Sequence, residues 1–179
     1  DIGGINMRGS KVIVFVIEAN KSSRSDENYI RALMNSLYSK EFQIKFIYMN
    51  GKTNYKKDRV TKEIKNYKSI FKPDNFEVYV VYIYDTDDHN RDRDCIKINN
   101  DIKTYCDSKK YFHIWFHTTI EEVLLGEFIT RSKVQESKKY LENVARGKTK
   151  IDVRNLKNLE YHTKSGSNFC LIIEEIKKS

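Results

Sequence analysis

Two uninterrupted apolar runs constrain what this chain can fold into. Residues 11–17 read KVIVFVI and residues 77–84 read EVYVVYIY, and both runs consist almost entirely of β-branched and aromatic residues. Strands that helices cover on both faces show no polar alternation, so these runs are typical of a buried parallel sheet. We therefore expect an α/β domain with helices on both faces of the sheet.

Further strand and helix signals alternate along the chain. Strand signals occur at 43–48 and 111–116. Helical periodicity marks residues 25–37 with Ser25 as a cap, 60–71, 98–106, 120–128, 134–145, and 169–177 with Ser167 as a cap. This order predicts a mostly parallel, four-stranded, Rossmann-like sheet flanked by helices, with a helical C-terminal tail. Ligands of such sheets bind beyond the carboxyl ends of the strands.

The length of 179 residues suits one domain, which we place at residues 7–179. Residues 1–6, DIGGIN, precede Met7 and are interpreted as a leader left by an expression vector. No run approaches the roughly 18 apolar residues of a membrane span. Three cysteines without a close pair, and no secretory apolar segment, argue against a disulfide framework. We expect a soluble, cytoplasmic protein with no membrane partner.

Charge is distributed unevenly along the chain, whose net charge is +8. Residues 52–72 hold eight basic and two acidic side chains, residues 131–164 hold ten and four, and residues 85–101 hold three and six. An acidic pocket between two basic walls would suit nucleic acid as a partner. Candidate nucleic-acid-binding residues are Lys56, Lys57, Arg59, Lys138, Lys139 and Lys164. The alternative is that these lysines are solvated faces of helices.

Acidic residues follow both buried strands. Asp85 and Asp87 are two residues apart at the end of the 77–84 run, so their carboxylates share one side if the extended backbone continues. Glu18 ends the 11–17 strand at the same sheet edge. Three such carboxylates suit one or two Mg²⁺ or Mn²⁺ ions rather than zinc. Further candidate metal ligands are Asp88, Glu27 and Glu122. The alternative is a solvated acidic turn.

The order of these motifs resembles the TOPRIM domain of topoisomerases, primases and OLD-type nucleases, and most closely its RloB-like branch in bacterial defence and mobile-element systems. The resemblance covers about residues 11–177 and rests on short motifs: Glu18, Glu27-Asn28-Tyr29, Asp85-x-Asp87-Asp88, Glu122-Val123-Leu124-Leu125, and a Ser/Thr-initiated helix at 165–176. The chain departs from the pattern at Ala19, where the family has glycine, and at Thr118-Thr119, where it has Asn-Pro.

This resemblance implies a Mg²⁺-dependent phosphodiester enzyme, with Asp85 and Asp87 as catalytic metal ligands and Glu18 as a ligand or general acid/base. No tyrosine stands out as a topoisomerase nucleophile, so hydrolysis of DNA or RNA is the expected reaction. The expected setting is antiphage defence or a mobile element, with a partner subunit of such a system. The alternative is a catalytically inactive TOPRIM-fold module that binds nucleic acid or a partner protein.

Other chemistries receive less support from the sequence. His113 and His117 have the spacing of a helical zinc pair, but in a strand four residues span about 13 Å. No Cys-x-x-Cys motif supports a structural zinc site. A haloacid-dehalogenase-type phosphatase carries its Asp-x-Asp on the first core strand, whereas here it follows a βαβα segment. Neither a Walker phosphate loop nor Gly-x-Gly-x-x-Gly occurs, so ATP and NAD are not indicated.

Overall fold

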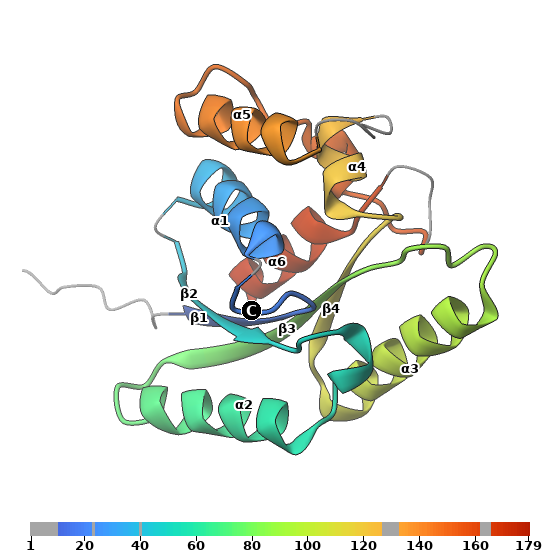
Figure 1. Ribbon diagram of the computed structural model, residues 1–179. Coiled ribbons are helices and arrows are strands. Elements are labelled where there is room, and N and C mark those ends of the chain that lie inside the picture. Colours follow the sequence, from blue (N-terminus) through green and yellow to red (C-terminus); the bar gives the residue numbers. More distant parts are fainter. Residues whose placement is uncertain (1–10, 23, 40, 127–132, 162–165) are drawn as a thin grey trace, which may run out of the picture.

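A computed structural model of the chain (Figure 1) describes residues 11–22, 24–39, 41–126, 133–161 and 166–179. The presumed leader at residues 1–6 therefore lies outside the described residues. Within them the expected α/β architecture is confirmed, with a four-stranded, all-parallel sheet. In spatial order the strands are β2 (Gln43–Tyr48), β1 (Lys11–Ile17), β3 (Glu77–Asp85) and β4 (Phe112–Phe116).

The strand register brings the carboxyl ends of the strands to one edge of the sheet. Ile17, the last residue of β1, pairs with Tyr48 on one side and with Ile83 on the other. Asp85 at the end of β3 pairs with Phe116 at the end of β4. This shared edge is where the sequence predicts the functional site.

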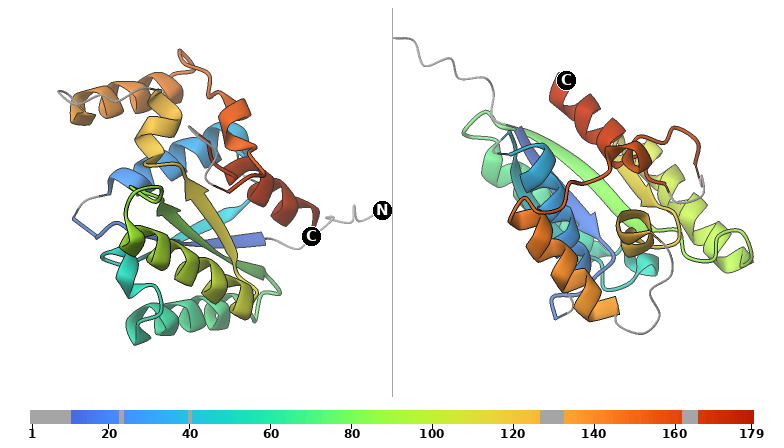
Figure 2. Two further views of the ribbon diagram at one scale, coloured as in Figure 1. Left: turned by 90° about the vertical axis from the view of Figure 1, so that its right-hand side faces the viewer. Right: turned by 90° about the horizontal axis from the view of Figure 1, so that it is seen from above.

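Helices cover both faces of the sheet (Figures 1 and 2). The α-helices are α1 (Ser25–Leu37), α2 (Asp58–Phe71), α3 (Arg93–Lys109), α4 (Ile120–Leu125), α5 (Lys133–Ala145) and α6 (Phe169–Lys178). Two short 3₁₀ helices are η1 (Lys52–Asn54) and η2 (Val153–Leu156). Helices α2 and α3 lie on one face, α1 and α6 lie on the other, and α5 packs on the outside of α1.

The central strand β1 explains why the sequence shows no polar alternation. Val14 and its alternate neighbours pack on the side of α2 and α3, whereas Phe15 and its alternate neighbours pack on the side of α1 and α6. Every residue from Val12 to Ile17 is fully buried. The strand thus contributes apolar area to two cores, and each fully buried side chain of this kind contributes roughly 1.5–3 kcal/mol.

Several helix boundaries differ from the predictions because of capping. Ser25 is the first residue of α1 and not its cap, since Arg24 occupies that position without a side-chain hydrogen bond. Helix α3 begins earlier than predicted because the Asp92 carboxylate accepts a hydrogen bond from the Asp94 amide. Ser167 does cap α6 in part, because its hydroxyl accepts a hydrogen bond from the Phe169 amide.

The chain after η2 covers the exposed edge of β4. Ser167 forms an antiparallel bridge with Phe116. The Asn168 side chain accepts a hydrogen bond from the Trp115 amide and donates one to the His113 carbonyl, both at 3.0 Å. These contacts satisfy backbone groups that an edge strand would leave unpaired.

Candidate functional site

Glu18 and Asp85 lie at the carboxyl edge of the sheet, as the strand pattern predicts. Glu18 directly follows β1, and Asp85 is the last residue of the adjacent strand β3. The negative charge of Glu18 makes Asp85 harder to ionise, and Asp87 adds to the effect at both residues. The three acidic residues therefore belong to one electrostatic site.

Asp87 does not continue the extended strand, contrary to the geometry assumed from the Asp-x-Asp spacing. Its φ of 50° is left-handed. The Thr86 and Asp87 amides donate to the carbonyls of Phe116 and Thr118, each at 2.9 Å, and the Thr118 amide donates to the Thr86 hydroxyl. These hydrogen bonds between the loops after β3 and β4 turn the backbone. The position of the Asp87 carboxylate is therefore set by the loop and not by strand alternation.

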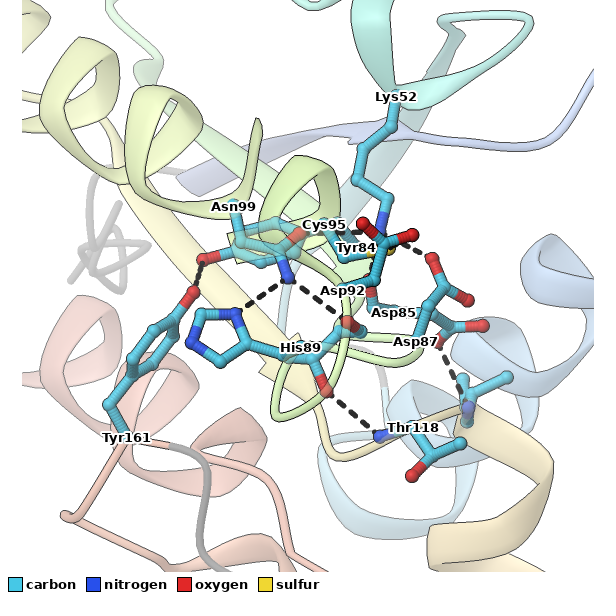
Figure 3. Close-up of polar contacts among 12 residues, drawn as sticks. Lys52, Tyr84, Asp85, Asp87, His89, Asp92, Cys95, Asn99, Thr118 and Tyr161 are labelled. Carbon is cyan, nitrogen blue, oxygen red and sulfur yellow. Dashed lines mark hydrogen bonds and ion pairs between the residues drawn. The ribbon is translucent and has the colours of Figure 1, made fainter. Parts of the chain in front are cut away.

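The Asp85 carboxylate is tied to the start of α4. Its Oδ1 accepts a hydrogen bond from the Ile120 amide at 3.0 Å (Figure 3). Burial raises the pKa of Asp85 well above its usual range, and the nearby charges of Asp26 and Glu121 raise it further. The single amide hydrogen bond therefore does not offset the cost of ionising Asp85.

Glu18 is a second desolvated carboxyl group. Burial raises its pKa from 4.5 to about 7, although the positive charge of Lys52 opposes the shift. The described part of the chain supplies no hydrogen bond to this carboxylate. A carboxyl group with a pKa near neutrality can exchange protons under physiological conditions.

Lys52 is a cation that contacts these acidic residues, and it comes from η1, after β2. Its ammonium donates to the Asp85 carbonyl at 2.5 Å, to Asp87 Oδ2 at 2.6 Å and to Asn99 Oδ1 at 3.2 Å (Figure 3). Only 7% of Lys52 is exposed. The charge pattern along the chain assigns this lysine to a basic wall, whereas the structure places it inside the acidic site.

Asn99 links Lys52 to His89. Because an ammonium can only donate, Asn99 must turn its Oδ1 toward Lys52. Its Nδ2 then donates to the Thr86 carbonyl at 3.0 Å and faces His89 Nδ1 at 3.1 Å. His89 Nδ1 must therefore accept, which selects the tautomer protonated at Nε2. Burial lowers the pKa of His89, as do the charges of Lys52 and His117.

The remaining acidic candidates are Glu27, Asp88 and Glu122. Glu27 accepts hydrogen bonds from the Tyr48 hydroxyl and, at 2.8 Å, from Arg31 Nε. Burial alone would raise the pKa of Glu27, but these two hydrogen bonds lower it. Asp88 is an exposed turn residue, and Glu122 lies in the first turn of α4.

The helix residues whose charges act on Asp85 are Asp26 and Glu121. Each of them lies one residue before a predicted ligand. The sequence contained a signal for them, since both lie in the acidic first turns of α1 and α4. The helical phase that decides which acid faces the sheet edge depends on packing. Glu27 and Glu122 stay predicted metal ligands, and the acids whose charges act on Asp85 each lie one residue before them.

The donor chemistry of the site fits a hard cation, although the side chains do not form a finished metal centre. Among the described residues, no three Asp, Glu, His or Cys side chains form a group that could hold a metal ion. Glu18 and Asp85 nevertheless offer carboxylate oxygens of the kind Mg²⁺ prefers, and both carry a desolvation cost that a cation would relieve.

A polar cleft adjoins Glu18 at the ends of β1 and β2. Its volume is about 590 Å³, and its lining residues are Asn20, Lys21, Ser22, Tyr48, Asn50 and Arg59. The Arg59 guanidinium is held there by hydrogen bonds to the carbonyls of Tyr48 and Met49 and by an ion pair with Glu63. The Gly51 amide donates to the Glu18 carbonyl, which links the loop after β2 to the end of β1.

The other candidate nucleic-acid-binding residues lie in separate segments. Lys56 and Lys57 are exposed just before α2. Lys138 and Lys139 lie on α5, and Lys138 lines a separate, mostly apolar cavity of about 610 Å³ between α1, α4 and α5. Lys164 lies outside the described residues. Of these candidates, Arg59 lines the polar cleft and Lys138 lines the apolar cavity.

Comparison with known proteins adds no assignment. No protein-family model, curated protein or solved structure matches this chain. None of the helices in the described ranges combines the length and the apolar character that crossing a membrane would need. The TOPRIM resemblance therefore stays a hypothesis based on the motifs quoted above.

Proposed function

We propose that this chain is a metal-dependent phosphodiesterase of the TOPRIM type that hydrolyses DNA or RNA. The observation that carries the proposal is the pair of desolvated carboxyl groups, Glu18 and Asp85, at the carboxyl edge of the sheet. Carboxylates with an unrelieved desolvation cost at the ligand-binding edge of an α/β fold favour a site that takes up a cation.

Mg²⁺ or Mn²⁺ suits these oxygen donors, and the candidates for holding it are Glu18, Asp85 and Asp87. When bound, such an ion would polarise the phosphate and stabilise the charge that develops on the leaving oxygen. The Asp85 carboxylate is oriented for this role by the Ile120 amide. The acidic neighbours Asp26 and Glu121 increase the negative potential that attracts the cation.

Glu18 has the properties of a general base in the proposed reaction. In the metal-free protein the pKa of Glu18 is about 7. A bound cation would lower this pKa and favour the ionised carboxylate, the form that accepts a proton from water. As the water oxygen bonds to phosphorus and the phosphorus–oxygen ester bond breaks, the Glu18 carboxylate takes the water proton. The leaving oxygen takes a proton from solvent, which balances the hydrolysis.

The polar cleft supports nucleic acid as the substrate class. Lys21 and Arg59 supply positive charge to this cleft, and Asn20, Ser22 and Asn50 supply hydrogen-bonding groups. A phosphate backbone needs this combination of cations and neutral donors. We include antiphage defence or a mobile element, with a partner subunit, as the biological setting because the motifs resemble the RloB-like branch.

One observation favours a catalytically inactive nucleic-acid- or partner-binding module as the alternative. Lys52 already supplies a positive charge to Asp87, and no group of described side chains could hold a metal ion as they stand. In that case Lys52 would stabilise the acidic site permanently, and the basic cleft would bind polyanions without cleaving them.

Incubation of the protein with supercoiled plasmid, single-stranded DNA and RNA, each with Mg²⁺, Mn²⁺ or EDTA, tests the proposal. We expect cleavage only with a divalent ion, and a decrease of about 100-fold or more in Asp85→Asn. Asp74→Asn is the matched control, because Asp74 is exposed in the turn between α2 and β3. Salt-sensitive binding that never leads to divalent-dependent cleavage would select the inactive module.

A further inference from the structure

All the N–H donors of the Lys52 ammonium are hydrogen-bonded within the protein. It has three N–H donors, and the structure gives it three acceptors: the Asp85 carbonyl, Asp87 Oδ2 and Asn99 Oδ1. The Lys52 side chain is only 7% exposed, so few water molecules can reach its ammonium. Lys52 therefore acts through its positive charge and by fixing the positions of these three groups. It has no further N–H to donate to a substrate.

Asp87 supplies the carboxylate among these three acceptors. The backbone of Asp87 is fixed by the hydrogen bond that its amide donates to the Thr118 carbonyl at 2.9 Å. Asp87 accepts from Lys52 through Oδ2, and the Asp87 side chain is 44% exposed whereas that of Lys52 is 7% exposed. If Asp87 turned away from Lys52 to ligate a metal, the nearly buried ammonium would lose its charged partner, which costs stability. The ion pair thus opposes any metal-ligand role that requires Asp87 to leave Lys52.

We propose, building on the function proposed above, that Lys52 is a protein-borne cation that replaces a second metal ion. In this arrangement Lys52 neutralises Asp87, while Glu18 and Asp85 ligate a single divalent ion. Lys52 is then a positioning residue that sets the number of metal ions. The Asp-x-Asp motif would contribute one metal ligand, Asp85, and one lysine partner, Asp87.

Titration of the metal-free protein with Mn²⁺, with free Mn²⁺ followed by electron paramagnetic resonance, tests this assignment without relying on activity. Wild-type protein should bind a single Mn²⁺. Glu18→Gln and Asp85→Asn should each weaken binding by about tenfold or more, since they remove a ligand. Asp87→Asn combined with Lys52→Gln removes the neutralised pair and should change the dissociation constant by less than about threefold. Asp87→Asn alone leaves the charge of Lys52 uncompensated and should weaken binding.

The second part of the Mn²⁺ titration replaces Lys52 alone. Lys52→Gln should release Asp87, tighten Mn²⁺ binding by about tenfold or more and admit a second ion, because a nearby positive charge repels a divalent cation. Lys52→Arg, which keeps the charge, should behave like wild type. Lys177→Gln is the matched control, since Lys177 pairs with Glu41 and lies in α6, outside the acidic site.

The outcomes separate this inference from the proposed function. A tenfold decrease of Mn²⁺ affinity in the double variant, or two tight ions in wild type, overturns the Lys52 assignment even if the wild-type protein cleaves nucleic acid. Unchanged or weaker Mn²⁺ binding in folded Lys52→Gln overturns it as well. Wild-type protein that neither binds Mn²⁺ nor cleaves nucleic acid overturns the proposed function, and this inference with it.

Discussion

Replacing Glu18 with glutamine in metal-free protein should stabilise the fold at pH 8 and have little effect at pH 5. Burial raises the pKa of Glu18 from 4.5 to about 7. Between these values the native state binds more protons than the unfolded state, so the free energy of unfolding falls as pH rises. Above about pH 7 the whole cost of the ionised Glu18 is present in wild type and absent from the variant.

The size of the effect follows from the shift of the pKa. At about 1.36 kcal/mol per pKa unit, the cost of ionised Glu18 is at most about 3 kcal/mol, and water that reaches the partly exposed carboxylate will reduce it. At pH 5 the same linkage leaves a difference below about 1 kcal/mol. For a chain of this length, about 3 kcal/mol corresponds to an increase of roughly 6–12 °C in Tm.

Urea unfolding in EDTA at both pH values measures these free energies. Glu27→Gln is the control, because the pKa of Glu27 is lowered by Tyr48 and Arg31. A lowered pKa contributes stability above the unfolded-state value, so Glu27→Gln should be destabilised at pH 8, the opposite sign. If Glu18→Gln is no more stable than wild type at pH 8, or equally stabilised at both pH values, the argument from desolvation is refuted.

Three further predictions concern the metal, the sheet edge and the cleft. Mg²⁺ at 100 times its dissociation constant should stabilise wild type by about 2.7 kcal/mol, and Asp85→Ala should abolish the shift in a thermal melt. Asn168→Ala should cost about 2 kcal/mol or more in urea unfolding, because it leaves two backbone groups of β4 unpaired. Lys56→Gln and Lys57→Gln should weaken the binding of nucleic acids of any sequence. They should also reduce the slope of log K against log salt concentration by about 0.7–0.9 for each phosphate that the protein no longer neutralises. Unchanged slopes would refute the assigned interface.

The fold could be predicted well because its strands are defined by local sequence. The 11–17 run has the bounds of β1, and the 77–84 run misses only Asp85 at the end of β3. Both strands are buried on two faces, so their composition reflects burial directly. The same regularity places Glu18 and Asp85 at one edge, since neighbouring parallel strands end together.

The rest of the site depends on contacts between distant segments. Lys52 looks like any lysine of the 52–72 stretch, and only the packing of η1 against the ends of β3 and α3 buries it beside Asp87 and Asn99. The left-handed φ of Asp87 follows from the pairing of its loop with the loop after β4. Composition and periodicity determined the sheet and the edge at which Glu18 and Asp85 lie. Tertiary structure alone decided which charge compensates which, because electrostatic partners are selected by distance in space and not by distance along the chain.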